Sequence, residues 1–290
     1  MNNLQKEGSE KWDMVIEPHS SFFNLNLAEV WRYRDLMMLF VKRDFVAQFK
    51  QTVLGPLWHI IQPLLTTLMF LLLFGRIARI PIGMNVHPTV FYMSGIILWN
   101  YFSACLTSTS GTFVTNANIF GKVYFPRLVL PLSVTISNII RFGIQFLLLL
   151  GFMIYFHFKG FPMQVTAEWL FIPVLVIIMA GISLGLGIII SSLTTKYRDF
   201  SVLLTFAVQL GMYATPIAYP LSFLKEGSFS RKVIELNPLT PLVEGFRYCL
   251  FGNNGFPIGS LVYSIVFMAV VVVFGIFFFN KVEKSFMDTV

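Results

Sequence analysis

Long charge-free, apolar stretches alternate with short charged segments along the chain. Six of these stretches reach about 20 apolar residues, the length that a helix needs to cross the hydrocarbon layer of a membrane. Helix is the expected conformation because lipid cannot satisfy the hydrogen bonds of a bare backbone. The pattern therefore predicts an all-α integral membrane protein with six transmembrane helices, near residues 57–74, 90–110, 132–156, 169–193, 201–219 and 259–279.

The composition supports a membrane protein and excludes several other classes. Of 290 residues, 56% are hydrophobic and only 12% are charged. Such a composition excludes a disordered protein, a disulfide scaffold and an ordinary soluble enzyme. The two cysteines, Cys105 and Cys249, lie in apolar surroundings, so we expect neither a metal site nor a structural disulfide.

The distribution of basic residues predicts the orientation. An even number of spans puts both termini on one side, and Lys and Arg are more frequent on that side. Because basic residues gather on the cytoplasmic side, we expect both termini in the cytoplasm. Residues 1–26 are polar and lack the apolar centre of a signal peptide, which predicts a flexible cytoplasmic N-terminus.

Segment 27–56 precedes the first span and has helical spacing. Apolar side chains recur there every three to four residues, which predicts an amphipathic helix in the inner interface, ended by Gly55-Pro56. Basic residues in this segment are candidates for binding a lipid diphosphate, or they serve only as topology charges. The candidates are Arg32, Arg34, Lys42 and Arg43.

The loop between the second and third spans, residues 112–130, carries aromatic and basic side chains together. An exposed aromatic and basic loop on the cytoplasmic side suggests a docking surface for a protein partner. The alternative is a loop that folds back on the membrane interface. The candidate docking residues are Phe120, Lys122, Tyr124, Phe125 and Arg127.

Segment 216–247 is semi-apolar but too interrupted by proline to span. This pattern predicts short broken helices that re-enter the outer leaflet between the fifth and sixth spans, tolerated only against protein or a water-filled path. They form either an outer gate or a static external cap. The candidate gate residues are Pro216, Pro220, Asn237, Pro238 and Pro241.

Missing motifs narrow the mechanism. The chain has no phosphate-binding G-x-x-x-x-G-K-[ST] loop, so it cannot hydrolyse ATP unaided. No span has a central Asp or Glu, which disfavours an ion-coupled carrier. A membrane glycosyltransferase or flippase acting alone would need acidic clusters, and a structural scaffold would not need the broken outer segment. Arg141 lies within the third span and either snorkels or lines a path.

Small and aromatic residues in the spans allow two further expectations. The string from Gly181 to Gly187 permits close helix packing, within the chain or between copies. Aromatic rings can stack on sugars, so some rings are candidates for a glycan channel, although lipid-belt or core packing is the competing interpretation. The channel candidates are Trp99, Tyr101, Phe206, Tyr213 and Tyr219.

Several short strings occur in an order and spacing that together are specific. They are Leu54-Gly55-Pro56-Leu57-Trp58, Phe120–Arg127 with Pro131-Leu132-Ser133, Tyr197-Arg198-Asp199, Thr215–Pro220, and Asn237–Pro241 with Phe246-Arg247-Tyr248. With these strings, the chain resembles the membrane subunit of ABC-2-type polysaccharide exporters, which carry O-antigen, capsule or teichoic acid.

The resemblance implies a permease without its own enzyme activity, in the bacterial inner membrane. It implies a homodimer with two copies of a cytoplasmic subunit that binds ATP and Mg, and a polyprenyl-diphosphate-linked glycan that passes between the two membrane subunits. Within a transmembrane domain of residues 57–290, loop 112–130 would receive the ATPase motion and segment 216–247 would be the outer gate. We expect no metal or cofactor in this chain and no nucleic-acid partner. The alternatives are export of a drug or small lipid, or of capsule or teichoic acid rather than O-antigen.

Overall fold

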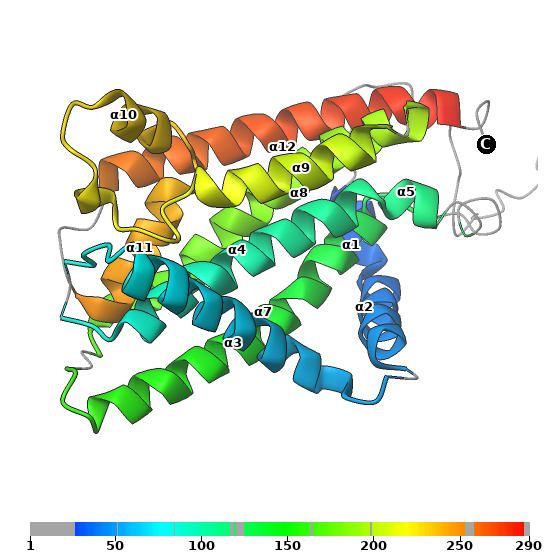
Figure 1. Ribbon diagram of the computed structural model, residues 1–290. Helices are drawn as coiled ribbons and strands as arrows, with labels where there is room; N and C mark the ends of the chain where they lie inside the picture. The colour runs from blue at the N-terminus through cyan, green and yellow to red at the C-terminus, as the bar shows by residue number, and fades with distance from the viewer. Residues whose placement is uncertain are drawn as a thin grey trace, which may run out of the picture.

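The computed structural model describes residues 27–50, 52–83, 85–116, 119, 125–162, 165–197, 199–252 and 258–286, and this part of the chain is helical without any strand. The predicted flexible segment 1–26 lies outside the described residues. The elements, labelled as in Figure 1, are α1 (Leu27–Arg32), α2 (Arg34–Phe49), η1 (Gly55–Leu57), α3 (Trp58–Phe70), η2 (Leu71–Ile77), α4 (Pro88–Ser110), α5 (Thr112–Thr115), α7 (Val129–His157), η3 (Ala167–Phe171), α8 (Ile172–Lys196), α9 (Asp199–Tyr213), η4 (Leu221–Phe223), α10 (Phe229–Glu235), α11 (Thr240–Phe251) and α12 (Ile258–Phe286).

Five stretches in the described part of the chain are long and apolar enough to cross a membrane. Each agrees with a predicted span to within a few residues, so five of the six predicted spans are confirmed. The stretches are Gly55–Ile77, Pro88–Ser110, Val129–His157, Ala167–Thr195 and Ile258–Phe279.

The remaining predicted span, 201–219, is shorter than expected. Helix α9 has 15 residues and ends at Tyr213, which gives a length of about 23 Å at 1.5 Å per residue. Pro216 is the physical reason, because proline lacks the N–H that a helix needs and disfavours a helical conformation at the preceding residue, Thr215. The prediction of a helix through residue 219 was therefore wrong at its C-terminal end.

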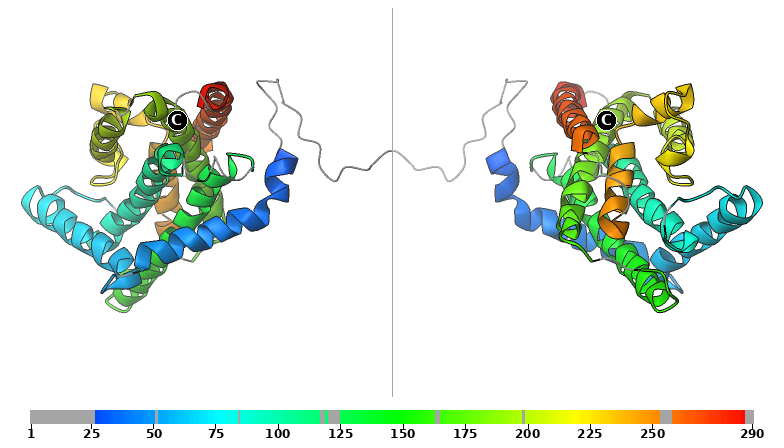
Figure 2. Two further views of the ribbon diagram at one scale, coloured as in Figure 1. Left: turned by 90° about the vertical axis from the view of Figure 1, so that its right-hand side faces the viewer. Right: turned by 90° about the vertical axis from the view of Figure 1, so that its left-hand side faces the viewer.

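Short helices lie at both ends of the bundle (Figures 1 and 2). Helices α1 and α2 lie across the end where α3 begins, which we call the N-terminal end. Helices α10 and α11 lie at the opposite end, which we call the distal end. Gly55 has φ +48°, a conformation that glycine adopts easily, and with Pro56 it turns the chain from α2 into α3 as predicted.

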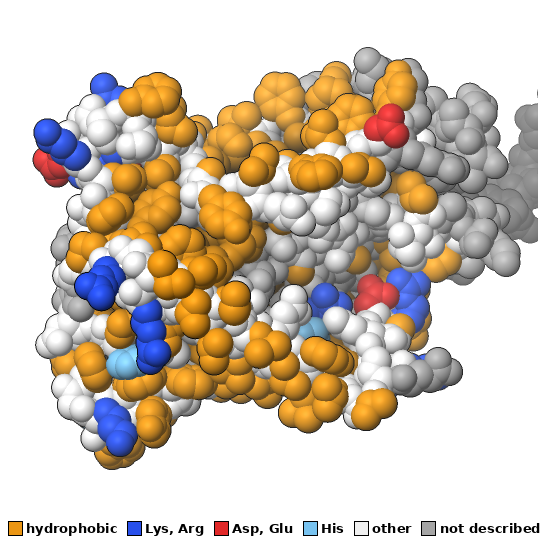
Figure 3. Space-filling view, viewed as in Figure 1, with side chains coloured by type: hydrophobic (Ala, Val, Ile, Leu, Met, Phe, Trp, Pro, Cys, Tyr) orange, Lys and Arg blue, Asp and Glu red, His pale blue; other side chains and the backbone are white. Residues whose placement is uncertain are grey.

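Helix α4 is the centre of the bundle. Of its most apolar stretch, 78% is buried, compared with 22% for the stretches containing α3, α7 and α12. The outer helices nevertheless expose many large apolar side chains, and Figure 3 shows a mainly hydrophobic face. This is the arrangement expected when lipid is the solvent, because apolar surface facing hydrocarbon carries no cost.

Small residues bring α8 close to α12 and α4. A Cβ atom added at Gly185 would lie 2.9 Å from the backbone of Val271, and one added at Gly187 would lie 2.6 Å from Thr109 Cβ. Thr194 also donates a hydrogen bond to the Ser110 carbonyl at 3.0 Å. The glycine string of the fourth predicted span therefore serves packing within the chain.

Candidate functional site

An apolar cluster at the N-terminal end joins the helices that precede the first span to the loop that precedes α7. We call it the N-terminal cluster. The rings of Phe40 and Phe125 lie 5.7 Å apart at its centre, and Phe125 is only 4% exposed. Its buried members are Val30, Phe40, Phe125, Val129 and Leu130.

The burial of Phe125 corrects one expectation from the sequence. Phe125 is not an exposed docking aromatic in this chain, because α2 offers an apolar face that covers it. Arg127 is half-buried beside it. The other predicted docking residues, Phe120, Lys122 and Tyr124, lie outside the described residues.

The structure does not bring the four predicted phosphate-binding residues together. Arg34 and Arg43 are nine residues apart on α2, which places them on opposite sides of the helix. Arg43 already contacts Asp44 at 2.7 Å and donates a hydrogen bond to Asn116 Oδ1 at 3.3 Å. Arg32 and Lys42 are exposed, and Arg34 lies 3.8 Å from the exposed Asp35.

The amphipathic pattern of segment 27–56 is also weaker than predicted. One side of α2 packs on α7 through Phe40 and Val41, as an amphipathic helix should. The other side still exposes Met38, Leu39 and Val46, each by more than half. Two apolar sides on a helix at the end of the bundle mean that α2 contacts the protein on one side and offers apolar surface on the other.

At the distal end, a buried arginine holds the turns that follow α9. Arg247 of α11 is 0% exposed. It donates hydrogen bonds to the carbonyls of Pro216 at 2.5 Å and Ile217 at 2.8 Å, and it lies 3.3 Å from Glu244 Oε1. Its guanidinium carbon also lies 3.8 Å from the ring centre of Phe91 in α4. Burial lowers the pKa of Arg247 to about 10, so the group stays charged at neutral pH.

A glycine in α4 makes this close contact possible. A Cβ atom added at Gly95 would lie 3.0 Å both from Arg247 Nη2 and from Ile217 Cγ2. Helix α4 therefore accepts the buried arginine and the turn that it holds. In the sequence, Arg247 stands out only within the string Phe246-Arg247-Tyr248, and the one signal of its buried ion pair is Glu244, three residues earlier in an otherwise apolar stretch.

A second side chain, Asn237, fixes the same turns from the other direction. Asn237 Nδ2 donates hydrogen bonds to the Ala214 carbonyl at 3.1 Å and to Thr215 Oγ1 at 2.9 Å. Ser264 of α12 donates a hydrogen bond to the Pro238 carbonyl at 2.7 Å. Of the predicted gate residues, the structure thus ties Pro216, Asn237 and Pro238 into the hydrogen-bonded segment of residues 214–251, which we call the distal cap.

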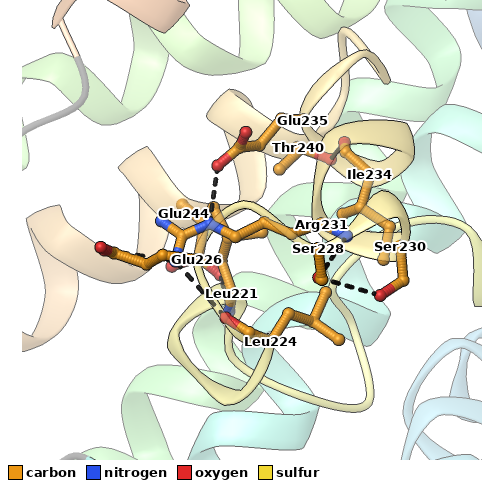
Figure 4. A network of polar contacts seen from close by, with 10 residues as sticks. All are labelled: Leu221, Leu224, Glu226, Ser228, Ser230, Arg231, Ile234, Glu235, Thr240 and Glu244. Atoms are coloured by element: carbon orange, nitrogen blue, oxygen red, sulfur yellow. Dashed lines mark hydrogen bonds and ion pairs between the residues drawn. The ribbon is translucent and has the colours of Figure 1, made fainter.

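A polar network on the outer part of the distal cap surrounds Arg231 (Figure 4). Arg231 Nε donates a hydrogen bond to Glu235 at 2.8 Å, which raises the pKa of Arg231, and its Nη1 atom lies 3.4 Å from Glu226. Thr240 donates a hydrogen bond to the Ile234 carbonyl at 2.6 Å, and Glu244 accepts one from the Leu221 amide at 3.4 Å. These contacts tie η4, α10 and α11 together.

Comparison with known proteins identifies the family. The model of the ABC-2 type transporter membrane family matches residues 35–251. The chain belongs to the ABC-2 type transporter family. Members of this family are transport components, and the family implies a separate subunit that binds ATP.

Curated relatives cover most of this ABC-2 chain. It is 31% identical to an O-antigen export system permease protein of Klebsiella pneumoniae over 257 residues, 88% of this chain and 94% of the relative. It is 27% identical to a protein of the same description from Myxococcus xanthus, over 78% of this chain and 84% of the relative. An inner membrane transport permease of Escherichia coli strain K12 is 24% identical over 71% and 82%.

The predicted channel aromatics fall into two groups in this ABC-2 subunit. Trp99 and Tyr101 of α4 are buried in the core of the single chain, where Tyr101 packs on Phe142 at 5.5 Å. Phe206 and Tyr213 of α9 are each 62% exposed. Tyr219 is half-buried and donates a hydrogen bond to the Tyr213 carbonyl at 3.0 Å. Only the last three are placed to meet anything outside the single chain.

Replacing Arg247 tests its role in the distal cap. Arg247→Met should destabilise the protein by about 3–5 kcal/mol, because it leaves two carbonyls and Glu244 without their buried partner. In thermal unfolding of the purified protein in detergent, this corresponds to a fall in Tm of about 10 °C.

Arg231→Met is the matched control, since it removes the same side chain from a more exposed network at the same end. It should cost about 1 kcal/mol or less. Equal falls in Tm for the two variants would contradict the assignment of Arg247 as the side chain that holds the distal cap.

Proposed function

We propose that this chain is the permease subunit of an ATP-driven exporter that moves a polyprenyl-diphosphate-linked, O-antigen-like polysaccharide across the bacterial inner membrane. The observation that carries the proposal is the similarity to permeases of O-antigen export, two of them 30–31% identical over 94% of their length. In this proposal the chain has no catalytic site and no cofactor of its own. ATP and Mg bind to two copies of a partner subunit, and nucleic acid plays no part.

The proposal includes six crossings and both termini in the cytoplasm. Helix α1 and the C-terminal end of α12 lie at the same end of the bundle, and α9 runs from that end to the distal end (Figure 1). Five long spans alone would leave the ends on opposite sides. Helix α9, continued by the turns of the distal cap, supplies the sixth crossing. Loop 112–130 then faces the ATP-binding subunits, and segment 216–247 lies outside.

A second copy of the chain is the proposed partner of α9. One face of α9 exposes Phe206, Leu210 and Tyr213, each by more than half. At about 23 Å, α9 is shorter than the roughly 30 Å hydrocarbon layer, and a short apolar helix relieves that mismatch by oligomerising. Two copies joined near α9 would place these rings beside the path between the copies, where aromatic faces suit a glycan.

The N-terminal cluster supports the proposed coupling to ATP hydrolysis. Phe125 connects the loop directly to α2 and to the first turn of α7. A force applied to the loop would therefore move α2 and α7 together. The docking surface itself is proposed to lie on Phe120, Lys122, Tyr124 and Arg127, with Phe125 as the apolar anchor below it.

Deleting the gene in its own host tests the exported substrate. The deletion should abolish the long-chain polysaccharide at the cell surface and accumulate the polyprenyl-diphosphate-linked glycan inside, because synthesis continues without export. Gel analysis of lipopolysaccharide and mass spectrometry of extracted lipids measure the two effects. An unchanged polysaccharide ladder would contradict the proposal, and loss of capsule, teichoic acid or drug resistance instead would assign the alternative substrate.

Truncating the apolar anchor should uncouple export from ATP hydrolysis. Phe125→Ala should reduce export at least about tenfold while the assembled complex still hydrolyses ATP, because removing a buried Phe costs about 3–5 kcal/mol of packing between loop and α2. Export and ATPase activity are measured on the same reconstituted complex.

Phe70→Ala is the matched control for this uncoupling. Phe70 of α3 is also buried but packs on Phe74 at 5.1 Å, outside both the N-terminal cluster and loop 112–130. An equal loss of export in both variants would indicate general destabilisation and not coupling.

Cysteine cross-linking tests the second copy. Phe206→Cys on α9 should form a disulfide-linked dimer in membranes, whereas Ile177→Cys on an equally exposed site of α8 should not. The native Cys105 and Cys249 are buried, so they contribute little background. A dimer formed through position 177 but not position 206, read on a non-reducing gel, would place the interface elsewhere.

A further inference from the structure

An arginine in a spanning helix lacks any acceptor in the described part of the chain. Arg141 lies in α7, is half-buried, and its buried Nε atom has no hydrogen-bond partner. No side chain or carbonyl of the described residues accepts a hydrogen bond from it. Arginine stays charged in proteins and offers five N–H donors, so an unpaired guanidinium within a membrane span is costly. Such a group points to an anion from outside the chain.

A second unpartnered side chain lies beside it. His59 of α3 is 7% exposed, its Nε2 atom is buried without a hydrogen-bond partner, and it interacts electrostatically with Arg141. Ser137, one helical turn before Arg141 on α7, also has a buried hydroxyl without a partner. All three groups can donate hydrogen bonds, which is the chemistry that binds an oxyanion.

The other charged and titratable groups near Arg141 leave its positive charge uncompensated. Asp44 of α2 interacts electrostatically with Arg141, but its carboxylate already contacts Arg43 at 2.7 Å. Cys105 of α4 is a buried thiol that forms no disulfide. Asn138, one helical turn before Arg141 on α7, adds a buried Oδ1 acceptor without a partner, so the three donor groups outnumber the unpartnered acceptor beside them.

The three groups lie beside the start of α3 and near the middle of α7. His59 is the second residue of α3, and Arg141 lies twelve residues after the start of α7, about 18 Å along that helix. Figure 3 shows basic, acidic and histidine side chains gathered next to α2, apart from a second group of charged and histidine side chains at the distal end. Arg141 is half-buried, so its side chain is the part of this group that surrounding lipid can reach, and the His59 Nε2 and Ser137 hydroxyl atoms lie buried beside it.

We propose that Arg141, His59 and Ser137 form a binding site for the phosphate headgroup of a membrane lipid. A guanidinium binds two phosphate oxygens at once through parallel N–H donors, and His59 Nε2 and Ser137 Oγ donate to the remaining oxygens. The inference rests on the proposed function, in which the transported glycan carries a lipid diphosphate. It moves the main phosphate contact from the surface residues of α2 to a half-buried site between the spans.

Lipid binding to the full chain in phosphatidylcholine nanodiscs tests the site. Undecaprenyl diphosphate and phosphatidylglycerol are titrated separately, and bound lipid is counted by native mass spectrometry. Arg141→Gln should weaken binding about tenfold, the loss expected for charge-assisted hydrogen bonds. Arg141→Lys keeps the charge but not the paired donors and should lose less, and His59→Phe should cause a smaller loss with its ring retained.

Lys159→Gln is the matched control, because it removes one positive charge from the opposite end of α7. It should leave binding unchanged. A loss confined to undecaprenyl diphosphate assigns the site to the glycan carrier, and a loss for phosphatidylglycerol assigns it to phospholipid headgroups. Full binding of both lipids by Arg141→Gln and His59→Phe would overturn the proposal. If Arg141→Gln does not insert, Arg141→Lys and His59→Phe decide the matter.

This binding assay needs neither the ATP-binding subunit nor a glycan. A negative result here therefore leaves the proposed export function standing, while an unchanged surface polysaccharide after gene deletion would remove the export function without affecting the lipid site.

Discussion

Hydrocarbon offers no hydrogen bonds, so every polar group that this chain carries into the membrane region must find its partner within the protein or in a ligand. Two arginines show the two outcomes. Arg247 is fully buried and has two carbonyls, a carboxylate and the face of Phe91 around it. Arg141 donates no hydrogen bond to any residue that the structure describes, and its buried Nε atom has no partner among them. The first arginine builds structure, whereas the second is available for binding.

The distal cap depends on the same constraint. Between the end of α9 and the start of α11 the chain is too irregular to satisfy its own backbone, and its carbonyls would be unpaired at the membrane surface. Arg247, Asn237 and Ser264 supply the missing donors to this segment. Because the three donors come from α11, from the loop before it and from α12, the turns after α9 are fixed to the rest of the bundle. A gate that opens at this end would have to move the distal cap as a unit or break these bonds.

The parts of the structure that follow from local rules could be predicted from sequence, and the parts that depend on distant partners could not. Apolar length alone located five spans, and Gly55-Pro56 marked the turn into the membrane. Pro216 also marks the end of α9 in the sequence, but the apolar residues on both sides of it led to the prediction of a longer helix. The partners of Arg247 lie about 30 residues earlier in the chain, and no spacing pattern connects a side chain with main-chain carbonyls at that separation.

The candidate site shows the same division. Aromatic residues in the spans could be counted from sequence, but only packing separates the buried Trp99 and Tyr101 from the exposed Phe206 and Tyr213. The aromatic side chains of the loop that carries Phe125 had two interpretations in the sequence, docking to a partner and folding back on the membrane interface. In the structure, the apolar face of α2 covers Phe125, so this ring packs inside the protein. Charge patterns on α2 likewise suggested one basic cluster, which the helical rotation between Arg34 and Arg43 separates.

Aromatic packing places the two arginines in one contiguous structure. Phe142, the neighbour of Arg141 on α7, lies 6.4 Å from Phe246, the neighbour of Arg247 on α11, and Phe146 lies 6.1 Å from the same ring. Such contact couples two sites energetically only if a structural element between them has two conformations and if both sites shift the equilibrium between these conformations. Helix α7 contacts both ends of the bundle, because it carries part of the N-terminal cluster at its start and its Phe142 and Phe146 rings face Phe246 of the distal cap. A headgroup that binds Arg141 would thus act on the same helix that the N-terminal cluster joins to loop 112–130 and that contacts the distal cap through Phe142 and Phe146.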